Sequence, residues 1–247
     1  VSASYALVYR VFPTGDILVE ASYIPAKGGG KVSEMPRFGM QVAIKPGFEN
    51  LRWYGRGPHE TYSDRCDARM DIYEGTVTAQ YFDYTEPGET GNKVDVRWVT
   101  LTNEKGVGLL AIGQPALSVN ALHYTTEDLM SVSHGWEMTK RDYVTLNLDL
   151  VQMGVGGDDS WGATPHPEFR IFPDKTYSYL FCLRPFNSKD ADLMKLTKRI
   201  FPVIAAPVVV RDADTGKVVL SCATPGVKLE YSFDGRTCKT YEGPIDV

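Results

Sequence analysis

Cysteine is scarce in this chain, and the few that occur are widely spaced. Four cysteines lie among 247 residues, and no two of them form a CxxC pair. Metal and redox sites built from cysteine usually need closely spaced thiols, so the sequence argues against both. We expect buried, unreactive thiols at Cys66, Cys182, Cys222 and Cys238, and leave open whether the last two pair.

Long apolar runs and an excess of positive charge are also lacking. No apolar stretch approaches the roughly 20 residues that span a membrane. Twenty-six Lys and Arg stand against 31 Asp and Glu, a net charge of −5 with neutral histidines. Because no basic cluster stands out, we expect neither a nucleic acid nor a membrane as partner. The chain starts at Val1 without a recognisable signal peptide, so we expect a fragment or processed chain.

What the sequence does contain is alternation of apolar and polar residues, the pattern of half-buried strands. Turn residues separate these runs at 13–16, 103–106 and 173–175. Many hairpin-spaced strands with little helix predict an all-β sandwich or barrel. Each of three runs is predicted to turn one face to the core: Phe38, Met40, Val42 and Ile44; Val94, Val96 and Trp98; and Val144, Leu146, Leu148 and Leu150.

One segment, 188–200, departs from this alternation. Leu193, Leu196 and Ile200 have helical spacing, Ser188 is placed to cap the helix, and two prolines follow at 202 and 207. We therefore predict a main domain over 1–187, a helical linker over 188–204, and a partial β module over 205–247. The last part holds only about 40 residues, which is marginal for an independent core.

Four motifs occur in a fixed order and carry a resemblance. They are LRWYGRGPHETYSDR (51–65), GNKVDVRWVTL (91–101), ALHYTTEDL (121–129) and NLDLVQMGVGGDDSWG (147–162). Together they resemble the C-terminal small-chain domain of the large β-galactosidases of glycoside hydrolase family 2. The tail, with TPGVKLEYSFDG and YEGPI, is similar to a truncated β module of the kind appended to chitobiases and hexosaminidases.

The resemblance implies a galactose mutarotase-like supersandwich of two large antiparallel sheets, and a parent enzyme that hydrolyses terminal β-D-galactosyl bonds with retention. It also implies that the catalytic carboxylates lie on a barrel domain outside this chain, which would then be inactive alone. No cofactor is expected here, although the parent would use Mg²⁺ or Na⁺ bound elsewhere. Expected partners are the parent's other domains, the galactoside and other copies of the enzyme, in a periplasmic, secreted or cytoplasmic setting.

The stretch MGVGGDDSWG, at 153–162, does not fit several familiar kinds of site. It lacks the lysine of a phosphate-binding loop, the paired glycines around a nucleophilic serine, and the ligand spacing of a calcium loop. It therefore predicts a turn, and the resemblance implies that the turn presents Trp161 to the aglycone or acceptor sugar beside the galactose. An indole face can stack on the apolar face of a sugar ring. The supporting loop residues are Gly156, Gly157, Asp158, Asp159 and Ser160.

Two other functions remain open. One is a free carbohydrate-binding module that uses Trp161 with Trp53, Trp98 or Trp136 as stacking surfaces. The other is an aldose mutarotase, which needs a histidine and a carboxylate reaching across a concave sheet and would use His123 or His134.

The charged motif PHETYSDR suggests a structural role instead of catalysis. Glu60, Asp64 and Arg65 lie within six residues. A buried charged cluster is tolerated only when its members are paired, so we expect these three side chains to form an ion and hydrogen-bond network that fixes a loop.

Overall fold

The computed structural model describes residues 3–26, 34–159, 161–189, 192–198, 205–224 and 226–246. It is all-β, as predicted, and divides into two compact units. The larger unit is Val1–Arg10 with Ile17–Ile200, and the smaller is Val11–Asp16 with Phe201–Val247. Among the described residues, no helix has the length and apolar character needed to cross a membrane.

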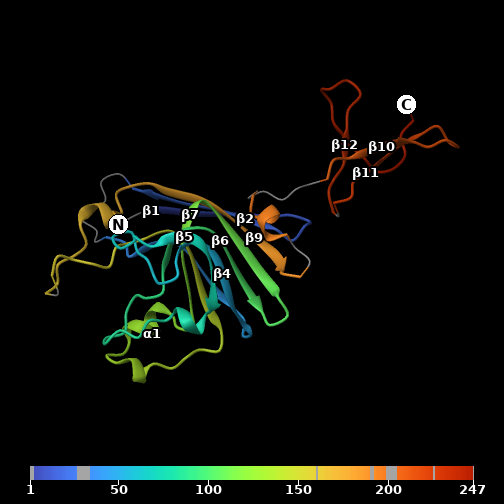
Figure 1. The fold of residues 1–247 in the computed structure, drawn as a ribbon. Helices are drawn as coiled ribbons and strands as arrows, with labels where there is room; N and C mark the ends of the chain where they lie inside the picture. The colour runs from blue at the N-terminus through green and yellow to red at the C-terminus, as the bar shows by residue number, and fades with distance from the viewer. Residues whose placement is uncertain are drawn as a thin grey trace. The chain divides into compact units, whose positions relative to one another are not determined.

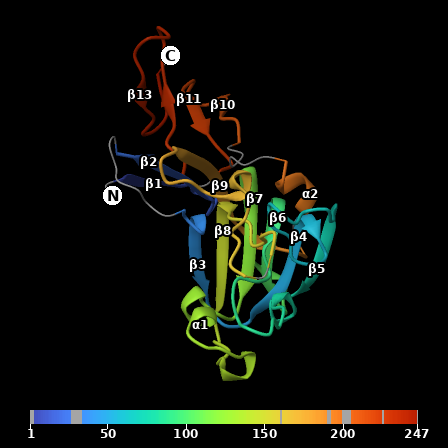
Figure 2. The same ribbon diagram turned by 90° about the vertical axis from the view of Figure 1, so that its left-hand side faces the viewer.

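Nine antiparallel strands of the larger unit form one connected sheet, in which β7 is the shared strand. The first half of β7 pairs with β9 and its last five residues pair with β8. Pro115, which has no N–H to donate to a ladder, lies between the two pairings. Figure 2 shows β3, β8, β7, β6, β4 and β5 side by side. The strands are β1 (Ala3–Val11), β2 (Ile17–Pro25), β3 (Arg37–Ile44), β4 (Phe48–Gly57), β5 (Arg69–Thr76), β6 (Lys93–Asn103), β7 (Val107–Leu122), β8 (Val144–Gln152) and β9 (Tyr177–Asn187).

The two arms of this sheet face each other across the main core. Phe38 of β3 packs against Tyr23 of β2 and against Tyr177 and Tyr179 of β9, with ring centroids 5.7–6.2 Å apart. Strands that are not hydrogen-bonded to one another therefore close over shared apolar side chains, which is the arrangement of a sandwich. The predicted apolar faces of β3 and β8 both point into this core.

The predicted single face of Val94, Val96 and Trp98 is wrong. The pairing of β6 with β7 shifts register twice, between Lys93 and Val96 and again between Val96 and Trp98. Asp95 has a φ of 57°, a backbone conformation typical of such irregularities. Each shift reverses the alternation, so Val96 joins the main core while Trp98 lies in a second apolar cluster with Leu110.

Short helical turns connect the strands, and the predicted helix over 188–200 is shorter than expected. Its described part is α2, capped by Asp192, whose side chain accepts from the Lys195 N–H at 3.2 Å. Ser188 does not cap it, because the described helix begins at Leu193 and Asp192 holds the N-cap position. Ile200 lies outside the described residues. The helical turns are η1 (Thr78–Gln80), α1 (Thr126–Met130), η2 (Gly135–Glu137), η3 (Pro167–Phe169) and α2 (Leu193–Leu196).

The smaller unit consists of two short hairpins. β10 (Val208–Arg211) pairs with β11 (Val218–Ser221), and β12 (Glu230–Tyr231) pairs with β13 (Lys239–Thr240). All four cysteines are free thiols, so Cys222 and Cys238 do not form a disulfide. Cys182 is buried as expected, whereas Cys238 is exposed.

Candidate functional site

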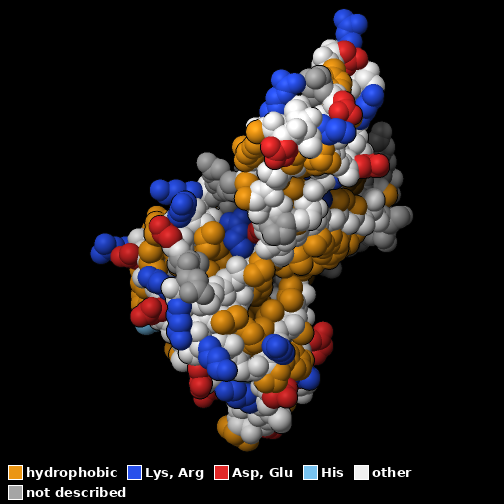
Figure 3. Space-filling model, turned by 90° about the vertical axis from the view of Figure 1, so that its right-hand side faces the viewer, with side chains coloured by type: hydrophobic (Ala, Val, Ile, Leu, Met, Phe, Trp, Pro, Cys, Tyr) orange, Lys and Arg blue, Asp and Glu red, His pale blue; other side chains and the backbone are white. Residues whose placement is uncertain are grey.

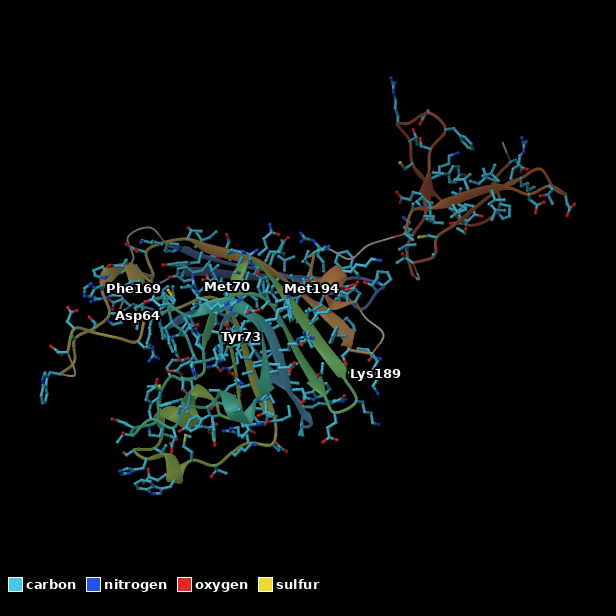
Figure 4. The ribbon with its side chains drawn as sticks, viewed as in Figure 1. Asp64, Met70, Tyr73, Phe169, Lys189 and Met194 are labelled. Atoms are coloured by element: carbon cyan, nitrogen blue, oxygen red, sulfur yellow. The ribbon has the colours of Figure 1, made fainter. Side chains whose placement is uncertain are left out.

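The loop that follows β8 projects away from the larger unit (Figure 1). It starts at Gly154, whose N–H donates to the Phe169 carbonyl at 2.9 Å. A Cβ at Gly154 would lie 2.5 Å from Asp64 Oδ2 and 3.0 Å from Phe169 Cβ, so only glycine fits between these two residues. Figure 4 shows Asp64 and Phe169 close together at this point. Asp64 Oδ2 also accepts from the Gly156 N–H at 2.7 Å, which fixes the first part of the loop.

The tip of the loop is held by its own aspartates. Asp159 Oδ1 accepts from the N–H groups of Trp161 at 2.8 Å and Ala163 at 3.3 Å, the local turn that aspartate favours. Gly157 is required here, because a Cβ would lie 2.1 Å from the Ala163 carbonyl oxygen. Ser160 lies outside the described residues.

A histidine closes the loop from its other end. His166 Nε2 lies 2.8 Å from Asp158 Oδ1, and both side chains are largely exposed. The hydrogen bond to Asp158, with the negative charges of Asp158 and Glu168, raises the pKa of His166. Asp158 was predicted from the sequence as a supporting residue, whereas its partner His166 was not.

Trp161 itself is 93% exposed. An indole held off the surface by a braced backbone is not a core residue, so packing within the described unit does not explain it. Chemically, such a ring can cover the apolar face of a ligand, because it buries a large area and has only two rotatable side-chain bonds. Its role as a substrate platform stays a prediction.

Of the three residues expected to form a buried charged network, Glu60 and Arg65 are paired, although the Arg65 side chain is 52% exposed. Glu60 accepts from Arg65 Nη2 at 2.5 Å, the Gly91 N–H at 2.7 Å, Thr90 Oγ1 at 3.1 Å and the Tyr84 hydroxyl. Burial opposes ionisation, yet these donors together hold the pKa of Glu60 below its usual value. Asp64 is not part of this cluster and instead binds the Trp161 loop, so the motif anchors two loops instead of one.

A cavity of about 770 Å³ opens beside the loop base. Arg37, Glu89 and Gln152 contribute its polar lining, and Gly154 and Val155 of the loop line it as well. Arg37 Nε donates to Gln152 Oε1 at 2.9 Å, and Arg37 Nη2 lies 3.5 Å from Glu89 Oε2.

Asp149 lies beneath Arg37 on the outward face of β8. Its Oδ2 is 3.3 Å from Arg37 Nε, and its side chain is 2% exposed. Burial, opposed by Arg37 and reinforced by the charge of Glu89, raises the pKa of Asp149 to about 7. Gly39 makes room for this carboxyl, since a Cβ there would lie 2.0 Å from Asp149 Oδ1.

This cluster of Arg37, Glu89 and Asp149 was not predicted, although the sequence of β8 held a signal of it. Asn147 and Asp149 alternate with the core-facing leucines of β8, and both are buried although they lie on the opposite face of the strand. Gln41 Nε2 donates to Asn147 Oδ1 at 3.0 Å across the strand pair, so polar residues of neighbouring strands satisfy one another. A buried polar face requires a covering layer, which alternation alone does not reveal.

The additional stacking surfaces considered for a binding module are mostly not available. Trp53 and Trp98 are each 2% exposed and belong to the two apolar clusters, so the expectation that either presents a face to a sugar is wrong. Trp136 is 80% exposed and stacks on His134, with ring centroids 4.1 Å apart.

The two histidines of the mutarotase hypothesis do not line the cavity. His123 is buried, with Nε2 2.8 Å from Glu49 Oε2 and Nδ1 3.2 Å from the Tyr143 carbonyl oxygen, so both ring nitrogens have structural partners. His134 is the N-cap of η2, with Nδ1 3.6 Å from Glu137 Oε1. Figure 3 shows acidic and basic side chains interspersed over one face of the molecule. Within the described ranges, no three His, Cys, Asp or Glu side chains are placed to hold a metal ion.

Comparison with known proteins supports the resemblance. Residues 1–183 match the family model described as beta galactosidase small chain. The chain is 39% identical over 184 residues to the beta-galactosidase of Priestia megaterium, and the alignment covers 74% of this chain and 18% of that protein. It is 34% identical over 176 residues to the beta-galactosidase of Halalkalibacterium halodurans, an alignment that covers 70% of this chain and 17% of that protein. It is 35% identical over 184 residues to the beta-galactosidase of Lactobacillus delbrueckii subsp. bulgaricus, with 74% of this chain and 18% of that protein covered. The chain thus spans less than a fifth of the length of these relatives, and it belongs to the beta galactosidase small chain family.

Proposed function

We propose that this chain is part of a larger β-galactosidase and completes its active site by presenting Trp161 to the aglycone or acceptor sugar. The parent enzyme would hydrolyse terminal β-D-galactosyl bonds by a retaining double displacement. One observation carries the proposal: Trp161 is 93% exposed at the tip of a loop whose backbone is held by Asp64 and Asp159. A fixed loop places the ring in one position before the sugar arrives, which lowers the entropic cost of binding.

In this proposal the small chain is not itself catalytic. The carboxylate network around Glu60 is engaged by Arg65, Tyr84, Thr90 and the Gly91 amide, which leaves it suited to fixing loops. The nucleophile, the acid/base and any Mg²⁺ or Na⁺ of the parent would lie in its other domains. The 247-residue chain alone should therefore not hydrolyse a nitrophenyl galactoside. Turnover by the pure chain that disappears when one of its own carboxylates is replaced would overturn this part.

The test of the platform role uses the full enzyme that contains this chain. Trp161→Ala should reduce kcat/KM for lactose by about 10-fold or more, since stacking and burial of an indole contribute about 1–3 kcal/mol. The same variant should affect a galactoside with a small leaving group much less, because that substrate offers no second sugar ring.

The chain provides a matched control for this experiment. Trp136 is also highly exposed but lies on η2, away from the glycine-rich loop. Trp136→Ala should leave both substrates unchanged. Equal losses on the two substrates in Trp161→Ala, or equal effects of the two tryptophan variants, would contradict the platform role.

A further inference from the structure

The cavity beside the loop base has features that the proposed function does not use. Its volume of about 770 Å³ falls within the range of roughly 300–1,000 Å³ found for small-molecule sites. Arg37 and Glu89 are mostly buried, with side chains 20% and 25% exposed. Two buried ionic groups at the wall of a cavity are costly to desolvate, so their presence calls for a ligand or a structural reason.

The polar groups of this wall are only partly satisfied. Among the described residues, Arg37 Nη2 and Asp149 Oδ2 make no hydrogen bond of ordinary geometry, although both are buried. The distances of 3.5 Å from Nη2 to Glu89 and 3.3 Å from Nε to Asp149 are those of loose ion pairs. Glu89 is similarly placed, since Oε1 accepts only long bonds from Tyr62 at 3.3 Å and Asn120 at 3.5 Å. The Arg37–Glu89–Asp149 cluster is therefore only loosely paired, and two of its members, Arg37 and Glu89, line the cavity.

The charges around the cavity indicate a neutral ligand. Two arginines and two glutamates line it: Arg37, Arg65, Glu86 and Glu89. Arg65 is already paired with Glu60, and Arg37 lies between Glu89 and Asp149. An anionic ligand would face these carboxylates, and a purely apolar ligand would bury Arg37 and Glu89 without replacing their water.

The remaining walls suit a ring with an apolar face. Leu129, Met130, Met153 and Val155 provide aliphatic and thioether surface, and Tyr84 provides an aromatic ring. An adjacent guanidinium and carboxylate can hydrogen-bond to two neighbouring hydroxyl groups, because each hydroxyl both donates and accepts a hydrogen bond. Charged partners also make these hydrogen bonds stronger than neutral ones.

We infer that this cavity is a second carbohydrate site, in which Arg37 and Glu89 bind adjacent hydroxyl groups of a neutral sugar whose ring packs against Met153 and Leu129. Asp149 acts as a positioning residue, because its carboxyl lies under the Arg37 guanidinium and does not line the cavity. The site is separate from Trp161, which does not line the cavity either.

The test is a titration of the ¹⁵N-labelled 247-residue chain, followed by NMR. The probes are methyl β-D-galactoside and methyl β-D-glucoside, with glucuronate and glucosamine as charged analogues. We expect saturable shifts at the amides of Gly88 and Gly154 with a millimolar Kd for at least one neutral glycoside. The charged analogues should bind about 10-fold or more weakly, because one charge then lacks a partner. Absence of saturable shifts with either neutral glycoside up to about 50 mM, roughly ten times such a Kd, would overturn the inference.

A blocking variant keeps the test independent of the ionic cluster. Gly88 lines the cavity, and a Cβ added there would meet nothing within 4 Å, so Gly88→Leu should add a large side chain at the cavity wall without a clash. We expect it to weaken glycoside binding at least about 10-fold, the equivalent of one lost charged hydrogen bond. Gly243→Leu is the matched control, since Gly243 also has open space but belongs to the smaller unit. Equal binding by the two variants would overturn the site.

Conservative replacements then assign the contacts. Arg37→Lys keeps the charge facing Asp149 but loses the planar fork, and Glu89→Gln keeps the size but loses the charge. Each should weaken the neutral glycoside by about 10-fold. Trp161→Ala should leave this binding unchanged. If Trp161→Ala alone abolished it, the sugar would lie on the loop and the cavity site would be excluded, while the proposed platform role would stand.

Discussion

Two regions of the larger unit differ in whether their polar residues are exposed or buried. The Trp161 loop is exposed, and its tip is held by short-range bonds that Asp159 accepts from the Trp161 and Ala163 amides, while Asp64 holds its base. The cluster of Arg37, Glu89 and Asp149 is buried and joins β3, the segment before β6, and β8. The comparison teaches that a turn can be recognised from neighbouring residues in the sequence. A cluster assembled across strands can be recognised only when the arrangement of the strands in the sheet is known.

The largest expected effect concerns the buried side of this comparison. Because the folded pKa of Asp149 is about 7 and its ordinary value is 3.8, the folded chain holds a proton between these pH values that the unfolded chain has released. Stability should therefore fall as pH rises from about 4 to 7, by as much as about 4 kcal/mol for three pKa units. Urea unfolding at pH 5, 6 and 7 measures this slope.

Asp149→Asn provides the control for the pH effect. The amide resembles the protonated carboxyl, so the variant should show a flatter profile over pH 5–7. Subtracting the two profiles removes the acids with lowered pKa values, such as Glu60 and Asp128, which lose their contribution only at lower pH. Identical slopes in the two proteins would show that Asp149 is ionised at pH 5 and is solvated instead of buried.

The next effect tests the packing of the same cluster. A Cβ at Gly39 would lie 2.0 Å from Asp149 Oδ1 and 2.3 Å from the Asp149 Cα, so β3 and β8 must move apart in Gly39→Ala. We expect a loss of about 3 kcal/mol in the free energy of unfolding. Gly88→Ala, where the added methyl meets nothing within 4 Å, should be nearly neutral. Similar stabilities for the two variants would mean that the strands do not pack this closely.

The smallest effect concerns the exposed loop. Asp64→Ala removes the acceptor of the Gly156 amide and should cost about 1 kcal/mol, with faster hydrogen exchange at that amide. Asp158→Ala breaks only the exposed pair with His166, so it should change global stability by less than about 0.5 kcal/mol. If Asp158→Ala loosened the Gly156 amide as much as Asp64→Ala, the loop would be held from its tip and not from its base.

Alternation and turn residues identified most of the fold. The apolar faces of β3 and β8 were predicted because strand periodicity is fixed by backbone geometry and these strands have one face in the core. The face of β6 was not, because two register shifts near Asp95 depend on how β6 meets β7. Likewise Ser188 was predicted as a helix cap, yet the described helix begins at Leu193 and is capped by Asp192.

The candidate site shows the same difference between features set by neighbouring residues and features set by distant segments. The glycines and aspartates of MGVGGDDSWG indicated a turn, the family resemblance implied that it presents Trp161, and the structure has Trp161 outside the core. His123, in contrast, looked like a candidate acid and is bound between Glu49 and Tyr143, a pairing between segments that are far apart in the chain. Trp53 and Trp98 looked equivalent to Trp161 by residue type and differ only in burial.

By itself, the sequence determined the all-β class, the β8 core face, the family motifs and the turn that carries Trp161, because each depends on residues within a few positions of one another. Only the tertiary structure decided that the polar face of β8 is buried, that Gly39 makes room for Asp149, and that Arg37 and Glu89 meet at a cavity. The physical reason is that burial and pairing across strands depend on what covers a residue, and the covering segments come from elsewhere in the chain.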